Sequence, residues 1–178
     1  MSDFDSRVMD LASRQGRTSK VRLVILVLAP LAAILFQVYV PRFVQPLSYL
    51  ELPLLMTVYF ALLRRNQVAG CFTGCAIGLL QDALSHHPLG MFGIVKTLVG
   101  YFAASVSQRF DVQNIALRFI LNFFFFMFHQ LLFWVLTRAL QGHPVDLNAA
   151  QTVIFAFLNA VVAIPLFLVL DKLKDEGR

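Results

Sequence analysis

Six apolar runs, each long enough to cross a lipid bilayer as a helix, fill most of this chain. A spanning helix needs about 20 predominantly apolar residues. None of the runs alternates apolar with polar residues as a membrane strand does, and a helix satisfies its own backbone hydrogen bonds in lipid. The runs cover residues 23–40, 47–63, 68–84, 90–107, 115–140 and 149–170. We therefore predict an all-α integral membrane protein, a compact bundle of about six transmembrane helices.

The composition leaves little room for a soluble domain. Hydrophobic residues make up 58% of the 178 residues and charged residues only 14%, whereas about a quarter of a soluble domain is charged. We predict a basic cytoplasmic tail over residues 1–22, a membrane domain over 23–170 and a cytoplasmic C-terminal tail over 171–178. The short connections make consecutive helices antiparallel neighbours in one bundle.

Basic residues are distributed unevenly between the two ends of the predicted helices. Twelve of the fifteen lysines and arginines fall on one side, two fall on the other, and Lys96 lies within a run. By the positive-inside rule, both termini are expected in the cytoplasm. The twelve are Arg7, Arg14, Arg17, Lys20, Arg22, Arg64, Arg65, Arg109, Arg118, Lys172, Lys174 and Arg178. The net charge of +5 is thereby explained by topology, and no nucleic-acid partner is expected.

Three ionisable residues, Glu51, Asp82 and Lys96, lie inside apolar runs. A charge at mid-bilayer costs about 3 kcal/mol or more, so each should have a partner. With both termini inside, all three fall in the outward half of the membrane. We predict that Lys96 pairs with Asp82 or Glu51. This buried polar cluster either holds the helices together, the interpretation we favour, or binds a substrate or proton.

Small residues recur on the third run. Gly70, Gly74 and Gly78 are spaced every four residues, which leaves one helix face almost bare and allows a neighbouring helix to approach closely. The phenylalanine-rich stretch 123–128 is apolar around its whole circumference, so we expect it to face lipid, with a partner helix as the alternative.

Other polar and proline residues have structural interpretations. Four polar residues, Asn122, His129, Gln130 and Asn159, are predicted to make hydrogen bonds between helices. Pro30, Pro53 and Pro165 are predicted to kink or loosen their helices, which places Glu51 beside a local break in the second run. The adjacent histidines 86 and 87 have no third ligand at suitable spacing, so no metal site and no cofactor are expected. No catalytic group of residues is apparent.

The stretch from Gly70 to Gly90 resembles the rod shape-determining MreD family. In that family a glycine-spaced helix ends in Gly-Leu-x-x-Asp, and a short turn then leads to Leu-Gly at the next helix. Further agreement comes from the second and last runs. The matching residues are Gly78, Leu79, Asp82, Leu89 and Gly90, then Leu54, Leu55, Tyr59, Ala61 and Leu62, and finally Asn159 and Pro165.

This resemblance implies a non-enzymatic scaffold in the bacterial inner membrane that maintains rod shape. Its expected partners are MreC and, through MreC, the MreB filament and the peptidoglycan polymerase and transpeptidase. A homodimer is also compatible with the sequence. The fold is expected to be similar to the substrate-binding S-components of energy-coupling factor transporters, so a small-molecule-binding transport subunit is the alternative. Candidate packing or partner-interface residues are Gly70, Gly74, Gly78, Asp82, Leu89 and Gly90.

Overall fold

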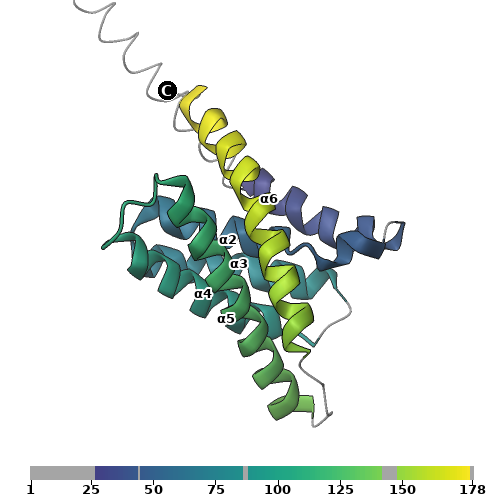
Figure 1. The fold of residues 1–178 in the computed structure, drawn as a ribbon. Helices are drawn as coiled ribbons and strands as arrows, with labels where there is room; N and C mark the ends of the chain where they lie inside the picture. Colours follow the sequence, from purple (N-terminus) through teal and green to yellow (C-terminus); the bar gives the residue numbers. More distant parts are fainter. Residues whose placement is uncertain (1–26, 44, 86–87, 142–147, 177–178) are drawn as a thin grey trace, which may run out of the picture.

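The computed structural model describes residues 27–43, 45–85, 88–141 and 148–176, and this part of the chain is helical without any strand (Figure 1). Each of the six predicted runs contains one α-helix. Histidines 86 and 87, the N-terminal tail 1–22 and the last two residues lie outside the described residues. The helices are Val27–Tyr39, η1 (Val40–Arg42), η2 (Gln45–Tyr49), α2 (Leu52–Arg64), α3 (Gln67–Leu84), α4 (Met91–Ser107), α5 (Ile115–Gln141) and α6 (Ala149–Glu176).

The second predicted run is interrupted near its start. The short helix η2 ends at Tyr49, and α2 begins only at Leu52. Pro53 therefore lies in the first turn of α2, where its missing N–H leaves no hydrogen bond unmade. The interruption expected near Pro53 is present as a break before α2, and the proline starts a helix instead of kinking one. Pro165, by contrast, lies inside α6.

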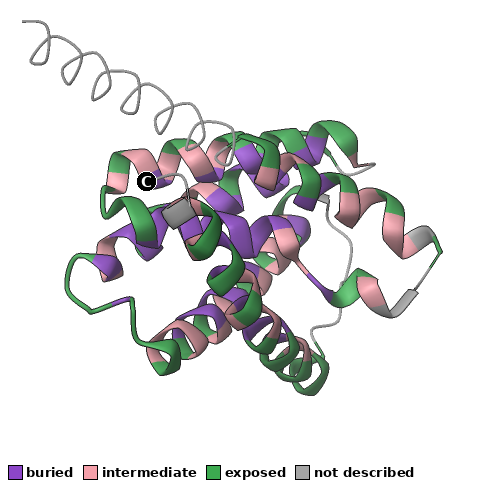
Figure 2. Cartoon of the chain, turned by 90° about the horizontal axis from the view of Figure 1, so that it is seen from above, coloured by how far each residue is buried: buried purple, intermediate pink, exposed green. Residues whose placement is uncertain are grey.

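Helix α2 is the centre of the bundle. Every residue from Pro53 to Leu62 is buried, so this helix is enclosed on all sides. Side chains from the other helices complete the core around it, including Ile34, Val99 and Phe167. Figure 2 shows the buried stretches gathered in the middle of the molecule and the exposed ones on its outside. Around α2, α3 lies against α4, and α5 lies against α6.

Large apolar side chains are exposed on the outer helices, as a lipid-facing surface requires. Phe72 is 72% exposed and Ile154 is 64% exposed. Three of the described segments are long and apolar enough to cross a membrane, namely Leu47–Arg64, Ile115–Leu140 and Ala149–Lys174. The helices Val27–Tyr39 and Met91–Ser107 are apolar but shorter. The molecule therefore has the surface and the helices of a membrane protein.

The phenylalanine-rich stretch 123–128 faces two environments. Phe124 is 58% exposed, whereas Phe125 and Phe126 are buried in the core. The expectation that this stretch faces lipid is therefore right for only one side of α5. Its other side packs into the bundle, and its uniform composition gave no sign of this division.

Candidate functional site

The glycine face of α3 is filled by α4. A Cβ atom added to Gly74 would overlap the backbone carbonyl oxygen of Lys96, and one added to Gly78 would overlap that of Phe92. At Gly70 it would overlap the carbonyl oxygen of Gly100 and lie 3.0 Å from the Cβ of Ala104. These contacts place two helix backbones against each other, as the small-residue spacing predicts. The face is occupied within the chain itself.

Asp82 binds the start of α4. Its carboxylate accepts hydrogen bonds from the backbone N–H groups of Gly90 (2.9 Å), Phe92 (3.1 Å) and Gly93 (3.0 Å). The first N–H groups of a helix have no partner within the helix, and the N-cap residue Gly90 has no side chain to supply one. Asp82, at the end of α3 and almost completely buried, takes that role.

The other two motif residues in this region, Leu89 and Gly90, directly precede α4. Gly90 has a φ of 99°, a left-handed conformation that glycine adopts without steric cost. Leu89, the residue before it, is 79% exposed. The spacing from Asp82 to Gly90 therefore matches a turn that returns the chain so that α4 begins beside the aspartate carboxylate.

Lys96 joins three helices from the inside of the bundle. It is completely buried. Its Nζ lies 3.9 Å from Oε2 of Glu51, at the start of α2, and 3.5 Å from Nε2 of His129 on α5. The same nitrogen lies 4.4 Å from the centre of the Phe92 ring. The structure thus brings Lys96 to Glu51, while the Asp82 carboxylate is engaged by backbone N–H groups.

Asn159 connects α6 to the break before α2. Its Oδ1 accepts a hydrogen bond from the backbone N–H of Glu51 at 2.8 Å, and its Nδ2 donates to the carbonyl oxygen of Tyr49 at 2.8 Å. The predicted interhelical role of Asn159 is confirmed. Asn122 differs, because its Nδ2 donates to the backbone carbonyl oxygen of Arg118 in its own helix. We call Glu51, Lys96, His129 and Asn159 the Lys96 cluster.

The Lys96 cluster connects four helices. Its members come from the start of α2, from α4, from α5 and from α6, and Lys96 contacts both Glu51 and His129. A buried charge is tolerated when an opposite charge and hydrogen bonds compensate for its lost solvation. Within the residues that the structure describes, no three His, Cys, Asp or Glu side chains are placed to hold a metal ion.

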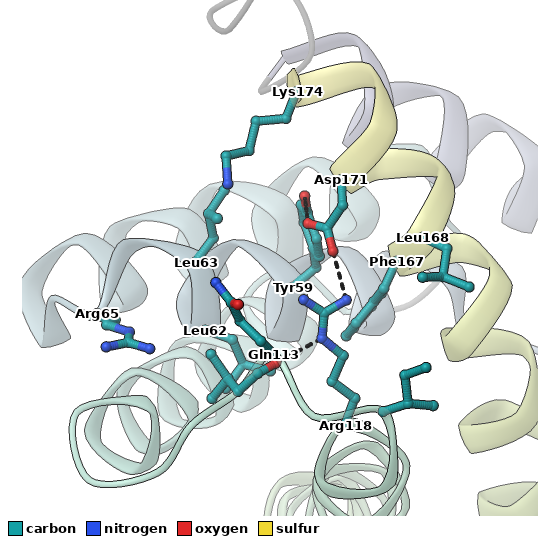
Figure 3. Close-up of a pocket in the computed structure, with 12 residues that line it drawn as sticks. Tyr59, Leu62, Leu63, Arg65, Gln113, Arg118, Phe167, Leu168, Asp171 and Lys174 are labelled. Carbon is teal, nitrogen blue, oxygen red and sulfur yellow. Dashed lines mark hydrogen bonds and ion pairs between the residues drawn. The ribbon is translucent and has the colours of Figure 1, made fainter. Parts of the chain in front are cut away.

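A second polar group lies at the opposite end of the bundle and was missed by the sequence analysis. The guanidinium of Arg118 donates to Oδ2 of Asp171 at 2.6 Å and to the carbonyl oxygen of Val112 at 2.7 Å. The Tyr59 hydroxyl donates to Oδ1 of the same aspartate at 2.9 Å. These residues line a cavity of about 710 Å³ (Figure 3).

The sequence contains only a partial indication of this second polar group. In the sequence, Arg118 and Lys174 stand out only as positive charges on the predicted cytoplasmic side. Asp171 stands out only as the first residue of the predicted tail. Asp171 directly follows an apolar run, and Arg118 lies in the first turn of another. Nothing local indicates that residues so far apart in the chain meet.

Comparison with known proteins identifies one family. The family model described as rod shape-determining protein MreD matches residues 17–175. No curated protein matches the chain. No solved structure matches it either, so the expected similarity to transporter S-components stays a prediction.

Proposed function

Because this chain belongs to the MreD family of rod shape-determining proteins, we propose that it is a non-enzymatic inner-membrane scaffold of the bacterial cell-elongation complex. Its role is to maintain rod shape by linking MreC and MreB to lateral peptidoglycan synthesis. The observation that carries this proposal is the extent of the family match, from residue 17 to residue 175. A match of that extent covers all the helices that position the polar groups.

The polar groups inside the bundle are consistent with a scaffold. Lys96 is turned toward Glu51 and His129, and Asp82 is surrounded by backbone N–H groups. Lys96 contacts groups at the start of α2 and on α5, and Asp82 on α3 binds the start of α4, so these contacts connect α2, α3, α4 and α5. A bundle connected in this way offers its outer surfaces to partner proteins.

We propose that the end of the bundle near Arg118 faces the cytoplasm. Two contacts gather distant segments there: Arg118 with Asp171, and the side-chain amide of Gln108 with the carbonyl oxygen of Arg65 at 3.1 Å. Three further basic residues are close to these contacts in the sequence, namely Arg64, Arg109 and Lys174. The positive-inside rule then puts the start of α5 and the end of α6 in the cytoplasm. Six membrane crossings and two cytoplasmic termini belong to this proposal.

Depletion in a rod-shaped bacterium tests the proposed function. Cells that lose this protein should become round, and the full chain should co-purify with MreC. A depleted strain that remains rod-shaped with normal wall insertion would contradict the scaffold role.

Photocrosslinking locates the partner surface. Crosslinkers placed at the exposed residues Phe72, Phe124 and Ile154 should give MreC adducts at one position or more, and adducts between two copies would identify a homodimer. The matched control is Phe125, which neighbours Phe124 but is completely buried. Adducts of equal yield at Phe124 and Phe125 would show that the labelling does not report a surface contact.

The transport-subunit alternative makes a different prediction. A purified sample should then bind a small molecule through Glu51, Asp82 or Lys96, and uptake should depend on those residues. The contacts of Asp82 with three N–H groups make this residue a less suitable ligand-binding group than Glu51 or Lys96, because its carboxylate is already engaged.

A further inference from the structure

The cavity of about 710 Å³ at the Arg118 end is lined by both charged and apolar residues (Figure 3). Its charged residues are Arg65, Arg118, Lys174 and Asp171, three cations against one carboxylate. The cations come from the end of α2, from α5 and from α6. A volume of this size is typical of small-molecule sites, which span roughly 300–1,000 Å³.

The guanidinium of Arg118 is held in position with donors to spare. Its contacts with Asp171 and Val112 use two N–H groups, and a guanidinium carries five. Asp171 is fixed in turn by the Tyr59 hydroxyl. An arginine oriented in this way is well suited to bind the oxygens of a phosphate group.

Some of the apolar residues that line the cavity are also exposed on the outer surface of the bundle. Leu63, Ile115 and Leu168 line the cavity, and they are 40%, 50% and 49% exposed. In a membrane these side chains meet acyl chains. Along α6 the sequence changes from apolar residues to Asp171, Lys172 and Lys174 at the level of the cavity, which is where headgroup phosphates lie.

We propose that this cavity binds an anionic phospholipid, with the phosphate at Arg118, Arg65 and Lys174 and the acyl chains along Leu63, Ile115 and Leu168. Basic pockets between membrane helices bind anionic headgroups by this chemistry. A soluble phosphate compound would use only the charged residues. The adjoining exposed apolar residues therefore favour a lipid. The site does not depend on the scaffold function.

Lipid binding to the full chain in detergent micelles tests the site, with phosphatidylglycerol as the probe and phosphatidylcholine as the uncharged comparison. The Arg65→Gln/Lys174→Gln variant should bind phosphatidylglycerol about tenfold more weakly, because each cation near the membrane surface contributes to anion attraction. Arg65 is exposed and Lys174 half-buried, and neither is part of the Arg118–Asp171 pair, so the thermal unfolding temperature should stay close to that of the wild type.

The matched control is Arg64→Gln/Arg109→Gln, which removes the same charge from exposed residues at the same end that do not line this cavity. It should change phosphatidylglycerol affinity less than about twofold. Equal losses in the two double variants would overturn the proposal by showing general surface attraction. Equal binding of the two lipids would also overturn it.

Competition distinguishes the lipid from other anions. Glycerol phosphate, which carries the headgroup chemistry without acyl chains, should displace phosphatidylglycerol only weakly. Displacement at a concentration similar to that of the lipid would assign the cavity to a soluble phosphate compound. Displacement by a short polyglutamate peptide would assign it to an acidic protein segment. Either result would refute the lipid site.

Discussion

The ammonium nitrogen of Lys96, on α4, lies 3.9 Å from a carboxylate oxygen of Glu51, the residue that precedes α2. Lys96 is completely buried within α4, and the Glu51 side chain, at the start of α2, is 16% exposed. His129 contacts the same ammonium group from α5. The positions of α2, α4 and α5 are therefore coupled through one charge.

Neutralising either member of this pair should destabilise the protein. Lys96→Met leaves a buried carboxylate without its counter-charge, and Glu51→Gln does the same to the lysine, so each should cost about 3 kcal/mol of unfolding free energy. The double variant should cost clearly less than the sum of the single variants. Unfolding in detergent micelles measures these values, and additive losses would contradict the pair. Lys172→Met, at an exposed position on α6, is the control.

Removing the Asp82 carboxylate should loosen the start of α4. Asp82→Ala leaves the N–H groups of Gly90, Phe92 and Gly93 without their acceptor, and we expect a loss of about 2 kcal/mol or more. Amide hydrogen exchange at these three positions should accelerate. The matched control is Asp111→Ala, because Asp111 is exposed and accepts a hydrogen bond from Gln113 in a loop. Unchanged exchange in Asp82→Ala would refute the role assigned to Asp82.

Enlarging a glycine on the inner face of α3 should separate α3 from α4. In Gly74→Leu the new side chain meets the backbone of Lys96 and Thr97, and overpacking of this kind costs about 1–3 kcal/mol or more. Ala76→Leu adds bulk to an exposed position on the same helix, and it should change the unfolding temperature little. Similar stability of the two variants would show that the close contact does not limit packing.

Removing the Tyr59 hydroxyl should weaken the Arg118 end of the bundle. Tyr59→Phe loses the hydrogen bond to Asp171, worth about 1 kcal/mol of unfolding free energy. The control Tyr101→Phe changes a 40% exposed tyrosine of α4 and should cost less than about 0.5 kcal/mol. In an Asp171→Ala background the effect of Tyr59→Phe should shrink, because its partner is gone. An undiminished effect would show that the hydroxyl acts elsewhere.

Helix positions followed closely from the apolar runs. The run 68–84 became α3 (Gln67–Leu84), and the run 90–107 became α4 (Met91–Ser107). Hydropathy is a local property, so a window of sequence is sufficient to find it. The interruption near Pro53 could be expected from the proline, but not its contacts, because Asn159 of α6, far away in the sequence, binds the backbone at Tyr49 and Glu51.

The partners of the polar residues required the assembled bundle. Depth in the membrane allowed Lys96 to pair with either Asp82 or Glu51. The structure places Lys96 beside Glu51, because the Asp82 carboxylate is engaged by the first N–H groups of α4. Arg118 and Asp171 were counted as loop charges, and their contact joins α5 to α6.

By itself, the sequence determined that this protein belongs in lipid, the approximate positions of the α-helices in the described part of the chain and the close approach expected at the glycine face. Each of these follows from residue type and spacing along one segment. Only the tertiary structure decided which charges meet, which side of the phenylalanine-rich stretch is buried and where a charged cavity lies. Those features depend on the rotation of each helix about its own axis and on its neighbours. No local pattern specifies that rotation, because many orientations bury a uniformly apolar helix equally well.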